Sequence, residues 1–376
     1  MNLTIATIAK QINASFEGDA SLLIDAISID SRSLQNGPHT LFFALIGPNN
    51  DAHSYIIDLI QQGVTHFVVQ YIPEDCVGKA HFLVVQNTLA ALQELASYHR
   101  SLFHFPVIGV TGSNGKTIVK EWLNFLLSPD YSIIRSPKSY NSPVGVPLSV
   151  LAIAKQHNFG IFEAGISTVN EMGYLEKIIQ PTLGILTNIG SAHDEGFSSI
   201  GEKIKEKLQL FKHCDLLIYN KNKTIDAFLR PTLKTFSWSF KDATADVFIQ
   251  KSSILDKTKL HIQLESYAFD IIIPFQDDAS IENAIHCLMV LLHLGYDRVT
   301  IEHRMYLLYP VEMRLKVKDG INSTTIIDDS YSSDFQSLKI ALDFLESQKQ
   351  YKKKTVILSD IFQSGLSNEE LYSKVS

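Results

Sequence analysis

Short apolar runs alternate with amphipathic stretches along most of the chain. The runs are rich in Val, Ile, Leu and Phe, and they read THFVVQ, HFLVVQ, FPVIGVTG, FGIFEAG, LGILTNIG, DLLIYN, TTIIDD and KTVILSD. Compact apolar runs that end in Gly, Asn or Asp are typical of buried parallel strands with polar loops at their carboxyl ends. Helical patterns such as TLAALQELASYHRSL and IGEKIKEKLQLFKH separate them. The pattern predicts an α/β fold with open, mostly parallel sheets.

One stretch has a different pattern. Residues 240–275 contain VFIQKSSIL, KLHIQLES and FDIIIPF, which alternate more strictly and have no long helix between them. This alternation predicts antiparallel strands appended to the middle of the protein.

The length of the chain predicts more than one domain, because 376 residues exceed an ordinary single core. We place breaks at HFP, before the strand that enters a Gly-rich loop, and at Tyr309-Pro310, after the helix IENAIHCLMVLLHLG. The predicted domains are 1–104, 105–311 and 312–376.

Composition excludes some functions. The formal net charge of −7 argues against nucleic acid as the main partner, since a duplex binder usually presents a basic face. Cys76, Cys214 and Cys287 are far apart and lack metal-binding spacing, which favours reduced thiols. There is neither a secretion signal pattern nor an apolar run of membrane-spanning length, so we expect a cytoplasmic protein.

The strongest chemical signal is the segment Val107–Thr117, in which a buried strand enters TGSNGKT and a helix follows. Glycines let backbone N–H groups approach phosphate, and a helix N-terminus adds partial positive charge. Lys116 could reach the β- and γ-phosphates, and the Thr117 hydroxyl could bind Mg²⁺. The general phosphate-loop pattern expects Gly where Val110 stands, so a Gly-rich turn without nucleotide is the alternative. The strand–loop–helix context favours nucleotide.

TGSNGKT resembles the loop of the Mur ligases and folylpolyglutamate synthetases, a family that lacks that first glycine. Further segments resemble the family in order, namely SYNSPVGVPLSVL, FEAGIS, TNIGSAHDEGF and IGEKIKEKLQLF. The resemblance implies a three-domain Mur ligase architecture with a central parallel-sheet P-loop ATPase domain. It assigns ATP to the loop residues Gly112, Ser113, Asn114, Gly115, Lys116 and Thr117.

The resemblance also implies a Mg²⁺ site formed by Thr117, Glu163, His193 and a carbamylated Lys207. Because the carboxyl ends of strands in an open α/β sheet face one crevice, the first three side chains could converge there. Taken singly, Glu163 and His193 would more often be structural or surface residues, and Lys207 would lie on a solvated helix face. Their order and spacing favour the site, with Lys116, Lys207, His193 and Arg314 as catalytic residues.

Downstream segments add nucleotide contacts by resemblance. Asn283, in the helix IENAIHCLMVLLHLG, would contact adenine, although a polar residue near the start of a buried helix has the same appearance. Arg314 in VEMRLKV would reach the γ-phosphate, and Asp329 in IIDDSYSSD would lie near the nucleotide.

The N-terminal and C-terminal segments resemble one branch of the family. Asp30-Ser31-Arg32 and FFALIG resemble the opening that holds the UDP part of the substrate, so Ser31 and Arg32 are candidate contacts. DDSY and EAGIS resemble the members that add D-Ala-D-Ala, with Asn141 and Ser167 as further substrate contacts. The implied activity is ATP-dependent joining of D-Ala-D-Ala to UDP-N-acetylmuramoyl-tripeptide through an acyl phosphate.

Several departures keep alternatives open. Ser142 and Gln209 replace an Asn and a Glu of the family, and Tyr331–Phe335 lacks two Asn and a Pro. Residues 312–376 are short for a domain of roughly 130 residues. We expect an incomplete Rossmann-like C-terminal domain in a fragment of a longer protein. The segment KKTVILSDIFQSGLSNEELY resembles bifunctional members that continue into an alanine racemase. The alternatives are a folate or amino-acid ligase on this scaffold and a non-catalytic or truncated nucleotide-binding module.

Overall fold

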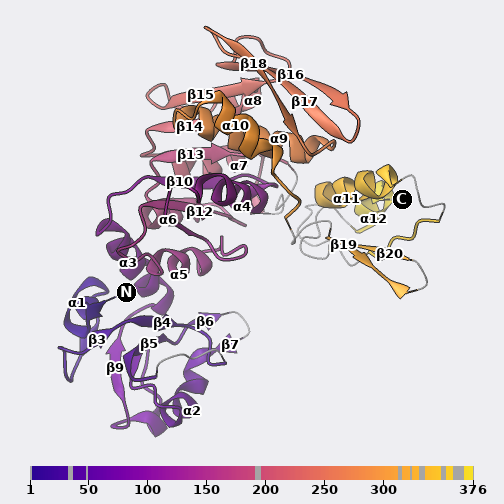
Figure 1. Cartoon of the computed structure of the whole chain (residues 1–376). Helices are drawn as coiled ribbons and strands as arrows, with labels where there is room; N and C mark the ends of the chain where they lie inside the picture. Colours follow the sequence, from indigo (N-terminus) through magenta and orange to yellow (C-terminus); the bar gives the residue numbers. More distant parts are fainter. Residues whose placement is uncertain are drawn as a thin grey trace.

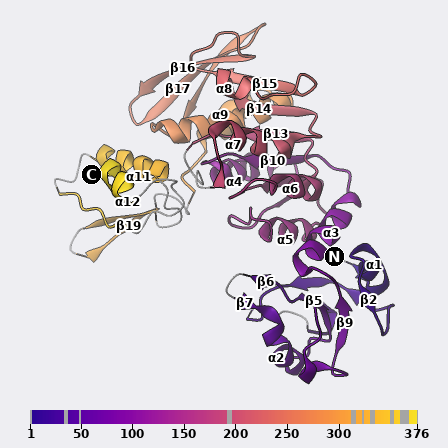
Figure 2. The ribbon, with the colours of Figure 1, turned by 180° about the vertical axis from the view of Figure 1, so that it is seen from behind.

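The computed structural model describes residues 2–32, 37–47, 50–190, 196–311, 316–321, 324–329, 335–348, 353–358 and 368–375. Its elements form three groups along the chain (Figure 1). A small sheet lies at the N-terminal end, a large sheet flanked by helices lies in the middle, and a few C-terminal elements lie to one side. The same arrangement is visible from behind (Figure 2).

The N-terminal group is built on a five-stranded sheet of order β2-β9-β8-β5-β4. Strands β4, β5, β8 and β9 run parallel to one another, and β2 pairs antiparallel with β9. The strands are β2 (Ser15–Phe16), β4 (Ala26–Ser28), β5 (Thr40–Phe43), β8 (His66–Val69) and β9 (His81–Val84). β5 and β8 are buried along their whole length, as expected for central strands of a parallel sheet.

Short elements complete this group. They are β1 (Leu3–Thr4), α1 (Ile5–Gln11), β3 (Leu23–Ile24), η1 (Gly37–His39), β6 (Ile46–Gly47), β7 (Asn50–Asp51), η2 (Ala52–Tyr55), α2 (Ile56–Gln61) and η3 (Glu74–Cys76). Helix α3 (Thr88–Ser101) follows β9 and packs on helices of the middle group. An apolar cluster therefore continues from the N-terminal sheet into the large sheet.

The middle group contains a nine-stranded sheet of order β11-β12-β10-β13-β14-β15-β16-β17-β18. Its strands are β10 (Val107–Thr111), β11 (Ile133–Arg135), β12 (Phe159–Glu163), β13 (Leu183–Leu186), β14 (Leu216–Asn220), β15 (Lys234–Ser239), β16 (Val247–Ile254), β17 (Lys257–Gln263) and β18 (Ala268–Ile273). The pairs from β11 to β16 are parallel, whereas β17 and β18 pair antiparallel. The antiparallel extension predicted for 240–275 is confirmed.

Helices cover both faces of this sheet. They are α4 (Lys116–Leu127), α5 (Gly145–Leu151), α6 (Met172–Ile179), α7 (Ile200–Leu208), η5 (Gln209–Phe211), α8 (Lys223–Asp226), α9 (Asp278–His293) and α10 (Arg298–Tyr306). α4 and α9 pack together in one core with the antiparallel strands. α5 and α6 belong to the core shared with α3. The parallel α/β class is confirmed, and no described helix is long and apolar enough to cross a membrane.

The C-terminal group comprises β19 (Lys316–Asp319), β20 (Thr325–Asp328), α11 (Phe335–Ser347) and α12 (Asn368–Val375). β19 and β20 pair antiparallel with each other. The strand predicted at KTVILSD is wrong for its described part, because residues 353–358 form neither strand nor helix. Val356 is 51% and Ile357 97% exposed, and no strand or layer among the described residues pairs with this apolar run or covers it.

Candidate nucleotide and substrate site

The Gly-rich loop between β10 and α4 needs glycine at two positions. Gly112 has φ +148° and Gly115 has φ +85°, both in the region that disfavours L side chains. A Cβ at Gly112 would lie 2.0 Å from Oγ1 of Thr187, and one at Gly115 would lie 2.2 Å from Oδ1 of Asn283. The loop is therefore tightly packed between the segment after β13 and helix α9, with Gly115 as the N-cap of α4.

The segment after β13 braces the loop by hydrogen bonds. The backbone N–H groups of Ser113 and Asn114 donate to the backbone oxygen and to Oδ1 of Asn188, both at 2.9 Å. Thr187 donates its hydroxyl to the Asn114 carbonyl at 2.5 Å, and the Gly190 N–H donates to Oγ of Ser113 at 2.8 Å. Sequence reasoning used this TNIG motif only to place His193, so the bracing role of Thr187 and Asn188 was missed. His193 itself lies outside the described residues.

Lysine side chains from two helices turn toward the same loop. Nζ of Lys116 donates to the carbonyls of Gly112 and Ser113 at 3.0 and 3.1 Å. Nζ of Lys203, which is 1% exposed on α7, donates to the Gly190 carbonyl at 2.5 Å. Ammonium groups that gather around a Gly-rich loop suit an anion with several charges. Lys203 was not among the predicted site residues, because a lysine in EKIKEK has no local signature of burial.

Lys207 is buried and faces the loop rather than solvent. Its Nζ donates to the Gly112 carbonyl at 3.1 Å, and the residue is 2% exposed. Burial lowers the pKa of Lys207 well below its usual range, and the positive charges of Lys116 and Lys203 lower it further. A solvated helix lysine is therefore excluded. A neutral, nucleophilic amine at this position is the form that reacts with CO₂ to give a carbamate.

Glu163 ends strand β12 in a fully buried environment. Its Oε2 accepts hydrogen bonds from Oγ1 of Thr117 at 3.1 Å and from Nδ2 of Asn141 at 3.3 Å. Its Oε1 lies 3.0 Å from Nζ of Lys120 as an ion pair, but no donor among the described residues is aligned to hydrogen-bond it. A carboxylate with unused lone pairs beside a threonine hydroxyl fits a hard cation such as Mg²⁺. Among the described residues, this site included, no group of three or more His, Cys, Asp or Glu side chains could hold a metal ion.

Of the three remaining predicted nucleotide contacts, two lie within the described residues. Asn283 is 5% exposed on α9 and abuts Gly115, which puts its amide beside the phosphate loop. Arg314 lies outside the described residues. Asp329 follows β20 directly in the C-terminal group, so its approach to the nucleotide stays a prediction.

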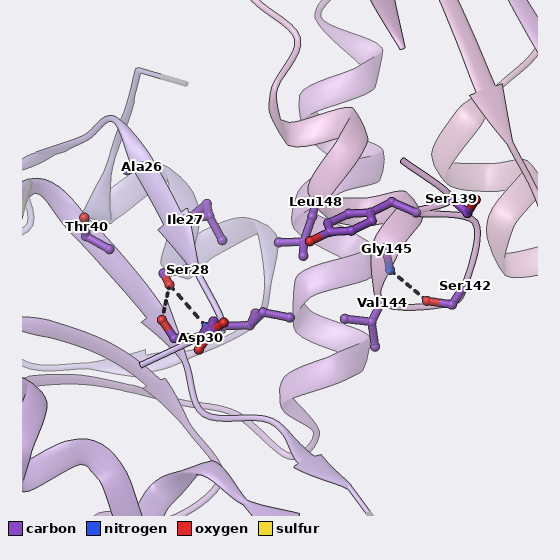
Figure 3. A pocket seen from close by; sticks show the side chains of 12 residues that line it. Ala26, Ile27, Ser28, Asp30, Thr40, Ser139, Ser142, Val144, Gly145 and Leu148 are labelled. Atoms are coloured by element: carbon purple, nitrogen blue, oxygen red, sulfur yellow. Dashed lines mark hydrogen bonds between the residues drawn. The ribbon is translucent and has the colours of Figure 1, made fainter. Parts of the chain in front are cut away.

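A cavity of about 500 Å³ lies between the N-terminal sheet and helix α5. Figure 3 shows the two walls facing each other. One wall comes from β4 and its continuation and the other from the loop before α5, with lining residues Ala26, Ile27, Ser28, Ile29, Asp30, Thr40, Ser139, Tyr140, Ser142, Val144, Gly145 and Leu148. Sequence reasoning missed Tyr140 and Thr40, since a lining position depends on two segments that are distant in sequence.

Three of the four predicted substrate residues are sequence neighbours of lining residues. Ser31 and Arg32 follow the lining residue Asp30, and the Arg32 guanidinium pairs with its carboxylate at 2.9 and 3.1 Å. This pairing lowers the pKa of Asp30 and raises that of Arg32. Asn141 lies between two lining residues and reaches Glu163, whereas Ser167 lies beyond β12, where its N–H donates to Glu171 at 2.7 Å.

One hydroxyl contact links the cavity to the nucleotide loop. Oγ of Ser139, a lining residue, lies 3.0 Å from Oγ1 of Thr117 at the start of α4. A group bound in the cavity would therefore meet the phosphate loop at the carboxyl edge of the large sheet, the usual ligand position in open α/β sheets.

Comparisons with known proteins agree with this geometry. Residues 110–291 match the Mur ligase middle domain family. The chain is 28% identical to a UDP-N-acetylmuramoyl-tripeptide–D-alanyl-D-alanine ligase of Buchnera aphidicola, over 94% of this chain and 77% of the relative. Among solved structures, a MurF from Acinetobacter baumannii has a TM-score of 0.87 at 23% identity, over 100% of this chain and 83% of that one. The MurF ligase of Thermotoga maritima in complex with ADP has a TM-score of 0.72 at 22% identity, over 85% and 74%.

Proposed function

We propose that the chain is a member of the Mur ligase family that joins D-alanyl-D-alanine to UDP-N-acetylmuramoyl-tripeptide with ATP, in the synthesis of peptidoglycan precursors. The proposal rests on one observation, namely that the Gly-rich loop and the cavity are connected through a pair of hydroxyl groups. A phosphate loop with buried lysines meets, through Thr117 and Ser139, a cavity of about 500 Å³.

The reaction transfers the γ-phosphoryl group of ATP to the terminal carboxylate of the tripeptide. The amine of D-Ala-D-Ala attacks the resulting acyl phosphate, an amide bond forms, the amine loses a proton, and phosphate leaves with ADP as the other product. Phosphoryl transfer depends on positioning and on charge neutralisation. The loop Gly112–Thr117 and the ammonium of Lys116 would hold the β- and γ-phosphates and neutralise the charge that develops.

Thr117 and Glu163 would hold Mg²⁺, which supplies positive charge between the phosphates. Oε2 of Glu163 and Oγ1 of Thr117 already face each other at 3.1 Å. His193 and a carbamylated Lys207 are the further proposed ligands. The lowered pKa of Lys207 supports the carbamate, because only the neutral amine adds to CO₂.

The cavity beside β4 would hold the UDP-linked substrate. Ser31 and Arg32 stand at the carboxyl end of β4, where an exposed guanidinium suits a diphosphate. Asn141 and Ser167 would lie nearer the reacting carboxylate and the incoming dipeptide.

The proposed division of labour follows the chain. Residues 1–104 would bind the UDP substrate and 105–311 would bind ATP, with Asn283 at the adenine. Residues 312–376 would form part of the C-terminal ligase domain, with Arg314 and Asp329 at the nucleotide. An alanine racemase domain after this segment in the natural protein also remains part of the proposal. A reaction that consumes ATP and a UDP-linked precursor would take place in the cytoplasm.

Phosphate release tests the proposal. The protein is mixed with ATP and Mg²⁺, and each substrate is omitted in turn. Release that requires both UDP-N-acetylmuramoyl-tripeptide and D-Ala-D-Ala, and that yields the pentapeptide product by mass spectrometry, supports the ligase. ATP binding without release under the full mixture would favour the non-catalytic module instead, and release with a folate or another amino acid would favour a different ligase on the same scaffold.

A further inference from the structure

Lys120 is a fully buried lysine one helical turn beyond Lys116 on α4. Its ammonium lies 3.0 Å from Oε1 of Glu163 and 3.0 Å from Oε1 of Glu121. It also donates to the carbonyls of Ser136, at 2.8 Å, and of Lys138. These four partners come from α4, from β12 and from the loop that follows β11.

Packing alone does not explain a charge at this position. The neighbouring buried positions of α4 are the apolar Val119, Trp122 and Leu123, whereas the ammonium of Lys120 lies among carboxylates and carbonyls. A buried ammonium loses its hydration and is retained at little or no net gain in stability, even when it is paired. The contacts of Lys120 therefore point to a role in ordering the groups around it.

The two carboxylate oxygens of Glu163 have different partners. Oε1 faces Lys120, whereas Oε2 faces Thr117 and Asn141. This division fixes the rotation of the carboxylate and directs Oε2 to the side of the phosphate loop. Among the described residues the ion pair with Lys120 is the one that Glu163 makes, so loss of the ammonium would leave this buried carboxylate without a full counter-charge from that part of the chain.

The same ammonium anchors the loop that reaches the cavity. Lys138 has φ +49°, an unusual backbone conformation for a non-glycine residue, and its carbonyl accepts from Lys120. The next residues are Ser139 and Tyr140, which line the cavity, and Asn141, which contacts Glu163. One side chain thus holds both the carboxylate and the loop.

We infer that Lys120 is a positioning residue that sets the Glu163 carboxylate for the nucleotide-bound cation and ties it to the loop 136–141. The inference rests on the proposed function, since it assigns Glu163 to Mg²⁺. It predicts that Lys120 acts through Glu163 and not by direct contact with nucleotide.

The test measures the affinity for a non-hydrolysable ATP analogue by calorimetry, with and without Mg²⁺. In the wild type, Mg²⁺ should tighten binding. In Lys120→Met this tightening should shrink by about tenfold or more, as for other partners that orient metal ligands, with little change in metal-free affinity. Glu121→Gln is the matched control, because it removes the other carboxylate on Lys120 and should leave the tightening nearly intact.

The double variant Lys120→Met/Glu163→Gln separates positioning from general structure. If Lys120 acts through Glu163, the double variant should show the same Mg²⁺ effect as Glu163→Gln alone. It should also fold if Lys120→Met does not, since no buried charge is left unpaired. Additive losses, or an unchanged Mg²⁺ effect in Lys120→Met, would overturn the inference and leave the ligase proposal standing. A wild type whose nucleotide binding ignores Mg²⁺ would overturn both.

Discussion

The two parallel sheets both place charges at their carboxyl edges, but they expose those charges differently. At the large sheet the side chains of Lys120 and Glu163 have no exposed surface. At the N-terminal sheet the side chain of Arg32 is 87% exposed and that of Asp30 is 40% exposed. Charges that are shielded from water interact more strongly and are already oriented, which suits phosphoryl transfer. Exposed charges suit the reversible recognition of a substrate.

The two edges also differ in how far their partners lie apart in the sequence. Arg32 pairs with a residue two positions away. Thr117 and Glu163, by contrast, meet from positions 46 residues apart. The large sheet therefore assembles its site by tertiary packing, so substitutions there should act mainly on turnover. Substitutions at the N-terminal edge should act mainly on binding.

The largest expected effect is that of Lys116→Ala. Removing the ammonium that faces the phosphate loop should lower kcat by about 10²- to 10³-fold, as for the loss of one preorganised charge-stabilising donor. Steady-state phosphate release measures this loss. Lys205→Ala, an exposed lysine on α7, is the control and should keep normal turnover. A loss in Lys116→Ala no greater than in the control would remove the phosphate role from this loop.

Lys207→Ala should follow, with a loss of about 10- to 100-fold. Burial and the charges of Lys116 and Lys203 lower the pKa of Lys207, which favours the neutral amine that adds CO₂. Wild-type turnover should fall when dissolved CO₂ is removed and recover with bicarbonate, while the variant responds to neither. A carbamate signal in ¹³C NMR after labelling with ¹³C-bicarbonate should appear only in the wild type. Equal responses in both proteins would argue for an unmodified lysine.

Arg32→Ala tests the exposed edge. Loss of one charge-assisted contact should raise KM for the UDP-linked substrate by roughly tenfold and leave kcat nearly unchanged. Arg298→Ala, an exposed arginine on α10, is the matched control. A fall in kcat with constant KM would mean that this edge takes part in turnover, and the contrast between the two edges would then be wrong.

The smallest expected effect is a pH-dependent loss of stability at the N-terminal sheet. Burial, aided by the charge of His81, lowers the pKa of His66 to about 4. As the pH falls, His66 therefore takes up a proton in the unfolded chain near pH 6.5, before it does so in the folded protein. The contribution of the neutral His66 to the free energy of unfolding is complete above about pH 6.5 and is lost as the pH falls toward 4. Between pH 7 and about 5.5 the loss should be about 1 kcal/mol.

Urea unfolding of the wild type and of His66→Phe at several pH values measures this contribution. The substitution keeps an aromatic ring beside Phe16 and removes the proton site. Its unfolding free energy should depend less on pH over this window. Parallel curves for the two proteins would assign the pH dependence to other groups.

Much of the fold was predictable, because buried elements repeat apolar residues at characteristic intervals in the sequence. The runs FGIFEAG and LGILTNIG became β12 and β13, and the alternating stretch 240–275 became β16–β18. The failure at KTVILSD has the same origin. An apolar run indicates a preference for burial but does not supply a neighbouring strand, and residues 353–358 pair with none in the part of the chain that the structure describes.

The site was predictable only where a motif is continuous in sequence. TGSNGKT identified the loop from Gly112 to Thr117, and the structure brings Thr117, Asn141 and Glu163 together. Lys120 and Lys203 were missed, because nothing in the neighbouring residues distinguishes a buried lysine from a solvated one. Their burial depends on β12 and on the TNIG segment, both distant along the chain.

By itself the sequence determined the α/β class, the Gly-rich loop with its lysine and threonine, and the resemblance to a ligase family. These three features depend on the spacing of apolar residues and on short motifs, both of which lie in consecutive residues of the sequence. Only the tertiary structure decided that the two oxygens of Glu163 face different partners, that Lys207 is buried, and that β4 and the loop before α5 enclose a cavity. Those properties arise from contacts between segments that meet after folding, and the strength of their charges depends on the exclusion of water at that point.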